Sequence, residues 1–317
     1  MIAPPEAGQP ISRRRFTTAA LGVISLAGAA PVAAASLGSS RKEPYKISLA
    51  QWSLHRELQG GDLDNVDFPR VTRERYGIDA VEFVNQFFKD KPRDDAYLAE
   101  LRSRAGDAGV KCLLIMCDGE GRLGDPDPVA RGKAVDNHVK WLEAASSLGC
   151  HSIRVNAASE GSYEEQQKLA ADGLGRLSRL ADGYDLNVIV ENHGGYSSNG
   201  AWLAGVMKMV DHDRCGTLPD FGNFCMDWSR KDDPDAWYDR YQGVKELMPF
   251  AKAVSAKTYA FDDSGDETAI DYGRMMKLVK NAGYDGYVGI EYEGSALSEH
   301  DGILATKRLL ERVRKSL

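Results

Sequence analysis

The segment VIVENHGG, residues 188–195, ends an apolar run in a carboxylate and an imidazole. Its first residues are β-formers, and Glu191, Asn192 and His193 follow directly before two glycines. Burying such polar groups costs free energy unless a partner or a ligand binds them. The segment therefore predicts a buried strand whose end carries chemistry.

Short β-rich runs of this kind recur along the chain, with helical patterns such as 94–109 and 134–149 between them. The runs are 46–53, 80–84, 111–118, 152–157, 187–193, 215–221, 253–261 and 286–294. Several helical patterns end on a glycine that introduces the next run, namely Gly109, Gly149 and Gly283. Strand–helix alternation predicts a parallel sheet. Eight units over residues 45–317 match the size of one closed (β/α)8 TIM barrel domain. An open doubly wound sheet is the alternative, but the first strand is followed by no glycine-rich phosphate fingerprint.

The first 35 residues predict a signal peptide rather than part of the barrel. Arg13, Arg14 and Arg15 precede Phe16 and a short Ala- and Gly-rich apolar run that ends in small residues. This order resembles a twin-arginine signal, which predicts export to the periplasm. Residues 36–44 would be a linker. A buried or membrane-anchoring helix is the alternative, but the run is short and glycine-rich, and the mature chain holds no transmembrane span of roughly 20 apolar residues.

Charge and cysteine content restrict the possible partners. The formal net charge is −7, and cleavage after Ala35 would remove a net +2 and leave −9. An acidic exported protein is a poor nucleic-acid binder. The five cysteines are odd in number and lie mostly in strand-like runs. They predict core thiols, with a single chance disulfide as the alternative.

Polar residues gather at the predicted strand ends, where barrel enzymes place their chemistry. They are Glu82, Asp118, Asn156, Glu191, His193, Asp220, Ser255, Lys257, Glu291 and Glu293. Strand residues two apart share a face, so His193 is expected to point the same way as Glu191. Three carboxylates in one cavity repel each other unless they are neutralised. A divalent cation held by Glu191, Asp220 and Glu291 is one solution. Private salt bridges with Lys257 or Arg154 are the other.

At these residues, in VIVENHGG, LPDFGNF and VGIEYEG, the sequence resembles the xylose isomerase-like barrels, the superfamily of sugar phosphate isomerases and epimerases. The resemblance runs from about Tyr45 to the C-terminus. It implies a metal held by Glu191, Asp220 and Glu291, with the two glutamates moving the substrate proton. The superfamily also includes an apurinic-site endonuclease branch, but its multi-metal cluster needs several histidines, and only six occur in this chain.

Two positions depart from the family pattern. Ser255 stands where the family has its strand-seven histidine, and Asn223 stands where many members carry a second histidine. A hydroxyl suits oxygen-preferring ions, so Mn²⁺ or Mg²⁺ is expected and Zn²⁺ less so. The alternatives are completion of the site by His193 or replacement of the ion by the Lys257 ammonium.

Catalytic roles are expected for Glu191, Glu291, Lys257 and His193. Lys257 would act as a base or stabilise an enediolate, or else form a salt bridge; His193 would act as acid, base or ligand, or else cap the glycine turn. Substrate contacts are expected from Glu82, Asp118, Asn156, Asn223 and Trp228, where structural pairing or packing is the alternative.

These residues predict an enzyme that abstracts a proton α to the carbonyl of a small-molecule sugar, as an isomerase, an epimerase or a keto-sugar lyase. The alternative is a non-catalytic exported sugar-binding barrel that has lost its metal. A nuclease-like phosphodiesterase is a weaker third possibility. An oligomeric state is compatible with the sequence but not specified by it.

Overall fold

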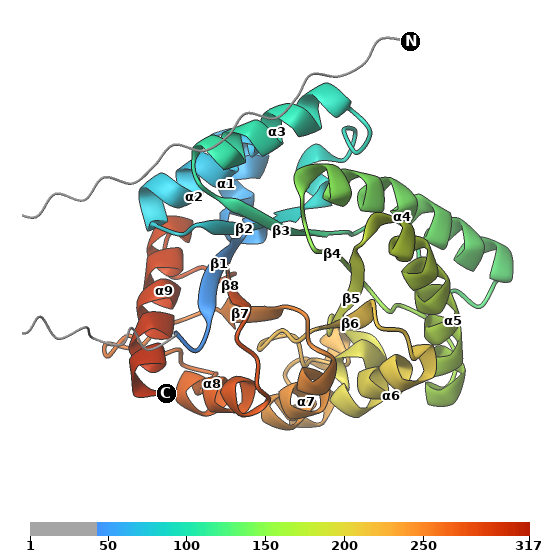
Figure 1. Ribbon diagram of the computed structural model, residues 1–317. Coiled ribbons are helices and arrows are strands. Elements are labelled where there is room, and N and C mark those ends of the chain that lie inside the picture. The colour runs from blue at the N-terminus through green and yellow to red at the C-terminus, as the bar shows by residue number, and fades with distance from the viewer. Residues whose placement is uncertain (1–42) are drawn as a thin grey trace, which may run out of the picture. The chain divides into compact units, whose positions relative to one another are not determined.

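Eight parallel strands follow one another around a closed barrel, with the helices outside them (Figure 1). The computed structural model describes residues 43–317. Hydrogen-bonded neighbours run in the order β6-β5-β4-β3-β2-β1-β8-β7. The remaining seam between β6 and β7 is closed by two parallel bridges, Thr217 with Ala251 and Asp220 with Ser255. The predicted (β/α)8 barrel is thereby confirmed.

All eight predicted strands are present, but most end earlier than their sequence runs. Their bounds are β1 Lys46–Ala50, β2 Ala80–Val84, β3 Lys111–Met116, β4 Ser152–Val155, β5 Asn187–Glu191, β6 Cys215–Leu218, β7 Val254–Thr258 and β8 Tyr287–Tyr292. The polar residues that lengthened the runs, such as Asp118 and Asp220, lie in the loops that follow. These loops form the mouth of the barrel, at the C-terminal ends of the strands.

The helices form a ring around the sheet (Figure 1). Their bounds are α1 His55–Gly60, α2 Phe68–Tyr76, α3 Asp95–Asp107, α4 Pro128–Leu148, α5 Tyr163–Ala181, α6 Gly200–Val210, α7 Arg240–Leu247, α8 Tyr272–Asn281 and α9 Glu299–Ser316. Helix α4 begins six residues before its predicted pattern, because Asp127 caps its first turn and Pro128 is its first residue. The glycines predicted to end helices do so: Gly109, Gly149 and Gly283 all have positive φ.

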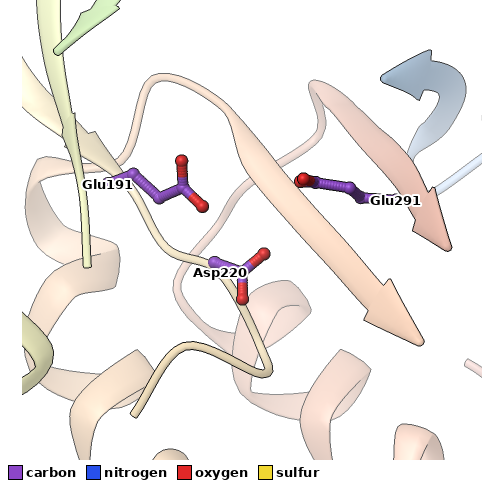
Figure 2. A group of neighbouring side chains, drawn as sticks. All are labelled: Glu191, Asp220 and Glu291. Carbon is purple, nitrogen blue, oxygen red and sulfur yellow. The ribbon is translucent and has the colours of Figure 1, made fainter. Parts of the chain in front are cut away.

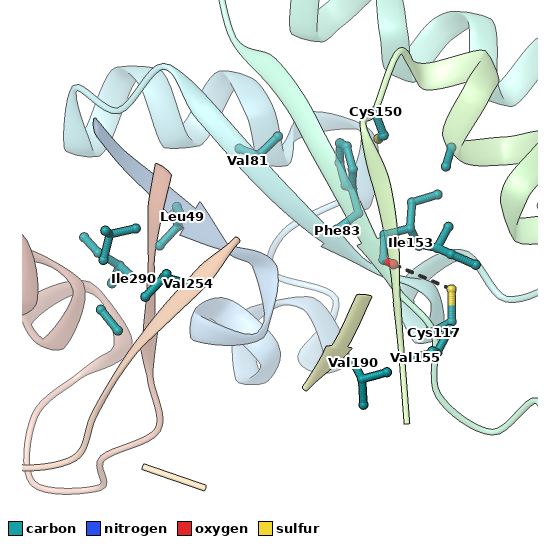
Figure 3. Packing of buried hydrophobic residues seen from close by; sticks show 14 of the residues in the cluster. Leu49, Val81, Phe83, Cys117, Cys150, Ile153, Val155, Val190, Val254 and Ile290 are labelled. Atoms are coloured by element: carbon teal, nitrogen blue, oxygen red, sulfur yellow. Dashed lines mark hydrogen bonds between the residues drawn. The ribbon is translucent and has the colours of Figure 1, made fainter. Parts of the chain in front are cut away.

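The hydrophobic core fills the space between the strands and the helices (Figure 3). Outward-facing strand residues such as Phe83, Ile153 and Val190 pack there with helix residues such as Trp141. A second, smaller cluster lies inside the barrel and includes Ala50, Leu114 and Ile189. All five cysteines are buried and free, which confirms the prediction of core thiols.

The signal peptide predicted at 1–35 and most of the linker predicted at 36–44 lie outside the described residues. Export and a periplasmic location therefore stay predictions. Within residues 43–317, none of the helices combines the length and the apolar character needed to cross a bilayer.

Helix α5 approaches the β3–α4 loop so closely that only glycine fits at one position. A Cβ added at Gly173 would lie 1.9 Å from the carbonyl oxygen of Leu123, whereas a Cβ at Gly106 in α3 would meet nothing within 4 Å. We expect Gly173→Ala to lower the free energy of unfolding by about 1–3 kcal/mol through overpacking. Gly106→Ala is the matched control and should raise it by up to about 1 kcal/mol through helix propensity. Urea denaturation measures both; equal effects of the two substitutions would contradict the packing.

Candidate active site

Three buried carboxylates from different parts of the chain meet at the mouth of the barrel (Figure 2). Glu191 is the last residue of β5, Asp220 follows β6 by two residues, and Glu291 lies near the end of β8. One ligand oxygen from each lies within 4.8 Å of the others, and none of the side chains is more than 3% exposed. Glu191 and Glu291 extend toward each other from opposite sides, with Asp220 between them (Figure 2). The predicted convergence of these three residues, the acidic cluster, is confirmed.

Two buried cations contact the acidic cluster. Lys257 Nζ lies 3.0 Å from Glu291 Oε1, 3.3 Å from Glu293 Oε2 and 3.9 Å from Asp220 Oδ2. On the other side, Arg154 Nε lies 2.7 Å from Glu191 Oε2. Both salt bridges considered as the alternative to a metal are therefore present. They do not by themselves balance the site, because Arg154 also pairs with Asp118 at 2.7 Å. Two cations thus face five carboxylates.

Neutral donors fix the orientation of the three carboxylates. The Ser255 hydroxyl contacts Asp220 Oδ2 at 2.6 Å and Glu291 Oε2 at 3.0 Å. The Asn223 amide donates to Glu191 Oε1 at 2.9 Å, and its backbone N–H donates to Asp220 Oδ1 at 2.8 Å. The departures from the family pattern, Ser255 and Asn223, therefore position the acidic cluster.

Burial and mutual repulsion shift the acidities of the cluster in different directions. Burial raises the pKa of Glu191 to about 7, despite Arg154, and raises the pKa of Asp220 to about 7, despite Lys257. Burial also opposes ionisation of Glu291, but the Lys257 ammonium outweighs it and lowers the pKa of Glu291. These carboxylates in turn raise the pKa of Lys257 against the effect of burial. At neutral pH the pair of Glu291 and Lys257 is ionised, while Glu191 and Asp220 are close to their titration points.

The residues fit an oxygen-preferring divalent cation. Glu191 Oε2 is buried and accepts no hydrogen bond, although Arg154 is near it. Three buried carboxylates, one with an oxygen that accepts no hydrogen bond, form the donor set that Mg²⁺ or Mn²⁺ prefers. No imidazole or thiolate joins the acidic cluster among the described residues. The excess negative charge of the site leaves room for a further cation despite Lys257.

Asp118 and Asn156 lie together on the β3–β4 side of the mouth. Asp118 Oδ1 accepts hydrogen bonds of 2.7 Å from both Arg154 and Asn156. Burial opposes ionisation of Asp118, but Arg154 outweighs it and lowers its pKa to about 2. Asn156 Oδ1 is buried without a partner, which leaves an acceptor for a substrate hydroxyl.

His193 does not follow the strand alternation expected for it, because β5 ends at Glu191 and the chain turns at Gly194 (φ 85°). Its imidazole is exposed and forms no hydrogen bond or ion pair among residues 43–317. Loss of water around the ring, together with the nearby Arg154 guanidinium, lowers the pKa of His193. The turn that His193 was considered to cap is held instead by Ser197 and Ser198, which accept from the backbone N–H groups of His193 and Gly194.

Glu82 and Trp228 lie apart from the acidic cluster. The expectation that Glu82 ends a strand is wrong, because the apolar Phe83 and Val84 continue β2 beyond it. Its carboxyl accepts from Ser48 at 2.6 Å and lines a cavity of about 240 Å³ with His151 and Lys252, which precede β4 and β7. This is the end of the barrel opposite the mouth. Trp228 is 53% exposed, in the loop after β6.

Two functional residues were not assigned roles from the sequence. Asn192 links two loops of the mouth: its amide donates to the carbonyls of Asp220 and Asn223 and accepts from the Asp220 N–H. Arg154 was considered only as a possible salt-bridge partner. Its signal was a cation inside the otherwise uncharged run SIRVNA, which can be buried only beside carboxylates.

Comparison with known proteins places this geometry in a family. Residues 73–315 match the family model described as "Xylose isomerase-like TIM barrel". The chain belongs to the xylose isomerase-like TIM barrel family. The predicted resemblance is therefore confirmed.

Two curated relatives are deglycosidase subunits. The chain is 32% identical over 296 residues to the 3'-dehydrocarminate deglycosidase alpha subunit of a Microbacterium species, a match covering 72% of this chain and 82% of the relative. It is 33% identical over 87 residues to the C-glycoside deglycosidase alpha subunit of Arthrobacter globiformis, which covers only 26% of this chain and 23% of that relative.

Solved structures share the fold at low identity. The 3-keto-D-glucoside 4-epimerase of E. coli superimposes with a TM-score of 0.65 at 17% identity, covering 84% of this chain and 99% of that one. A xylose isomerase-like barrel from Mycobacterium smegmatis in complex with magnesium gives a TM-score of 0.60 at 17% identity, covering 86% and 98%.

The buried carboxyl of Glu82 predicts a pH dependence of stability. Burial raises its pKa from 4.5 to about 8. Between pH 4.5 and about pH 8, Glu82 holds a proton in the folded protein that it has lost in the unfolded chain. The contribution of Glu82 to the free energy of unfolding therefore falls as pH rises, by up to about 1.4 kcal/mol per pH unit. Glu82→Gln removes the titrating group. We expect its stability relative to wild type to increase steadily from pH 5 to pH 8 in urea denaturation.

The control for this measurement is Glu164→Gln, at an exposed position of α5. It should leave the slope of stability against pH unchanged. Parallel slopes for wild type and Glu82→Gln would show that Glu82 is ionised in the folded protein.

Proposed function

We propose that the chain is a divalent-metal-dependent enzyme that removes the proton next to the carbonyl of a keto-sugar glycoside. The observation that carries the proposal is the acidic cluster, with a buried lysine beside Glu291. Two relatives support this substrate class, since their names specify a 3-keto-glucoside and a 3'-dehydro compound. The magnesium complex of a solved neighbour supports the ion class.

Glu291 and Glu191 are suited to opposite halves of a proton transfer. Lys257 keeps Glu291 ionised, so Glu291 can accept the proton from the carbon next to the carbonyl. Glu191, with a pKa of about 7 and a position across the acidic cluster, can hold or return a proton from the other side. Two groups whose environments separate their pKa values in this way are typical of acid–base catalysis.

Lys257 stabilises the negative charge that forms. When the C–H bond breaks, its electron pair moves toward the carbonyl oxygen and gives an enolate, which a fixed ammonium stabilises in a buried site. A bound divalent ion would be held by Glu191, Asp220 and Glu291 and would supply Lewis-acid polarisation of the carbonyl.

The enolate has three outcomes. Protonation at the same carbon on the opposite face gives an epimer. Protonation at the former carbonyl carbon, with the proton of the α-hydroxyl passing to the former carbonyl oxygen, gives an isomer. Expulsion of the glycosidic oxygen from the carbon β to the carbonyl gives an unsaturated keto-sugar and the free alcohol. All three need the same first step, which the geometry of Glu291 and Lys257 supports.

Catalysis is tested by solvent exchange. In D₂O, the wild-type protein should incorporate deuterium next to the carbonyl of a 3-keto-glucoside, as measured by NMR. Glu291→Gln should slow this incorporation by about 10²–10⁴-fold, because general-base catalysis contributes that much. Glu164→Gln should leave it unchanged. Equal exchange rates in wild type and Glu291→Gln would contradict the assigned base.

Metal binding is tested separately with Mn²⁺ alone. We expect calorimetric titration to show one site in wild type and none in Glu191→Gln. Affinity should rise from pH 6 to pH 8, because Glu191 and Asp220, with pKa values raised to about 7, must lose protons to bind the ion. Glu120→Gln is the matched control: Glu120 is also buried but pairs with Trp141 and Lys140 away from the acidic cluster.

A non-catalytic sugar-binding barrel is the second candidate. It is favoured by Ser255 in place of a histidine and by the Lys257 ammonium 3.0 Å from Glu291. Sugar binding without Mn²⁺ binding or deuterium incorporation in wild type would establish it.

A further inference from the structure

A cavity of about 490 Å³ opens over the segments that follow β4, β5 and β6, at the same end of the barrel as the acidic cluster. We call it the outer cavity. Its volume lies in the range of small-molecule sites. It is lined from three segments: Ser159 in the loop after β4 and Gln166 in α5, Gly195 and Tyr196 after β5, and Met226 and Asp227 after β6. None of these residues has a role in the acidic cluster.

Two of the segments that line the outer cavity closely follow, along the chain, residues at the acidic cluster. Gly195 follows Glu191 by four residues, and Met226 follows Asn223 by three. Asn223 itself contacts Glu191 and Asp220. Since each residue spans at most about 3.6 Å, Gly195 lies within about 14 Å of Glu191 and Met226 within about 11 Å of Asn223. These upper bounds are roughly the length of a two-ring molecule.

One exposed aromatic residue lines the outer cavity, and a second follows a lining residue directly in the chain. Six large apolar side chains are exposed in the described part of the chain, and the two aromatic ones are Tyr196 and Trp228. Tyr196 lines the cavity and is held edge-on by Tyr163, with ring centroids 5.4 Å apart. Trp228 follows Asp227 directly and is held edge-on by Trp237, with centroids 5.8 Å apart. Exposed aromatic faces of this kind stack on flat or pyranose rings.

Trp228 also lies against the turn that follows Glu191 along the chain. A Cβ built on Gly194 would lie 3.5 Å from the indole nitrogen, so the indole covers the turn that links His193 to the outer cavity.

The charges of the outer cavity disfavour an anionic ligand. Asp227 and Asp235 line it, and the one lining cation, Arg230, forms an ion pair with Asp233. Carboxylates accept hydrogen bonds from hydroxyl groups and repel phosphate or carboxylate groups. The chemistry of the walls therefore suits a neutral ring that carries hydroxyl groups.

We propose that the outer cavity binds the second ring of a two-ring glycoside whose keto-sugar ring occupies the acidic cluster. This ring is neutral and carries hydroxyl groups, as a second sugar or a phenolic aglycone does. Tyr196 and Trp228 are the residues that set the preference for it. The proposal rests on the proposed function for the position of the first ring, but it concerns binding and needs no turnover.

The experiment compares one-ring and two-ring ligands by calorimetric titration of the full chain. The probes are methyl β-D-glucoside, cellobiose and phenyl β-D-glucoside, each oxidised at C3, titrated into Glu291→Gln so that turnover does not interfere. We expect at least one two-ring probe to bind about tenfold more tightly than the one-ring probe. Adding Trp228→Ala should remove about fivefold to tenfold of this preference, in line with about 1 kcal/mol of ring stacking. Binding of the one-ring probe should change less than twofold.

Trp228→Phe keeps a stacking face and should retain most of the preference, while Met209→Ala, at an exposed site on α6, should retain all of it. A gain with cellobiose alone identifies a sugar as the second ring, and a gain with the phenyl glucoside alone identifies an aromatic aglycone. Equal binding of all three probes, undetectable binding included, would overturn the inference. So would an equal loss for all three in Trp228→Ala.

These outcomes are separate from the test of catalysis. A two-ring preference that depends on Trp228, without deuterium exchange in wild type, would retain the outer cavity and refute the enzyme. Deuterium exchange with no two-ring preference would retain the enzyme and refute the role of the outer cavity.

Discussion

Electrostatic repulsion among three buried carboxylates is the constraint around which the mouth of this barrel is built. Glu191, Asp220 and Glu291 come within 4.8 Å of one another with almost no exposure to water. The chain meets this cost with Lys257 on one side and Arg154 on the other, and with hydroxyl and amide donors between them. The same arrangement separates the pKa values of the two glutamates, so that Glu291 stays ionised while Glu191 titrates near neutrality. Stability and chemistry at the mouth therefore have one electrostatic origin.

The seam that closes the barrel also helps to build the acidic cluster. Ser255 pairs with Asp220 through the backbone at the seam between β6 and β7, and its hydroxyl also contacts Asp220 and Glu291. Asn192 joins the β5 and β6 loops through three hydrogen bonds. A residue that closes the fold thus also orients two carboxylates, so a substitution of Ser255 would affect packing and chemistry together. Lys257 follows on the same face of β7 and reaches the acidic cluster from its other side.

Most of the fold and the centre of the site follow from the sequence, because alternation of strands and helices and polar strand ends are local patterns. These two patterns were enough to predict the eight strands and the meeting of Glu191, Asp220 and Glu291. Local pattern is weakest where it does not fix direction. The strand period used to place His193 stops at Glu191, so its direction stays a prediction, whereas Glu82 was wrongly placed at a strand end that comes two residues later. The amide links of Asn192 depend on which loops face each other, which spacing along the chain does not specify.

The proposed sugar chemistry rests on the charged groups at the mouth of the barrel as well as on the relatives. The proposed function requires a cation beyond Lys257 and Arg154, which five carboxylates share, and the all-oxygen donor set is of the kind that Mn²⁺ or Mg²⁺ prefers. The most direct measurement is a crystal soaked in Mn²⁺ with diffraction recorded for anomalous scattering. We expect one strong anomalous peak within bonding distance of Glu191, Asp220 and Glu291. A fully soaked crystal with no peak there, and with the Lys257 ammonium still against Glu291, would contradict it.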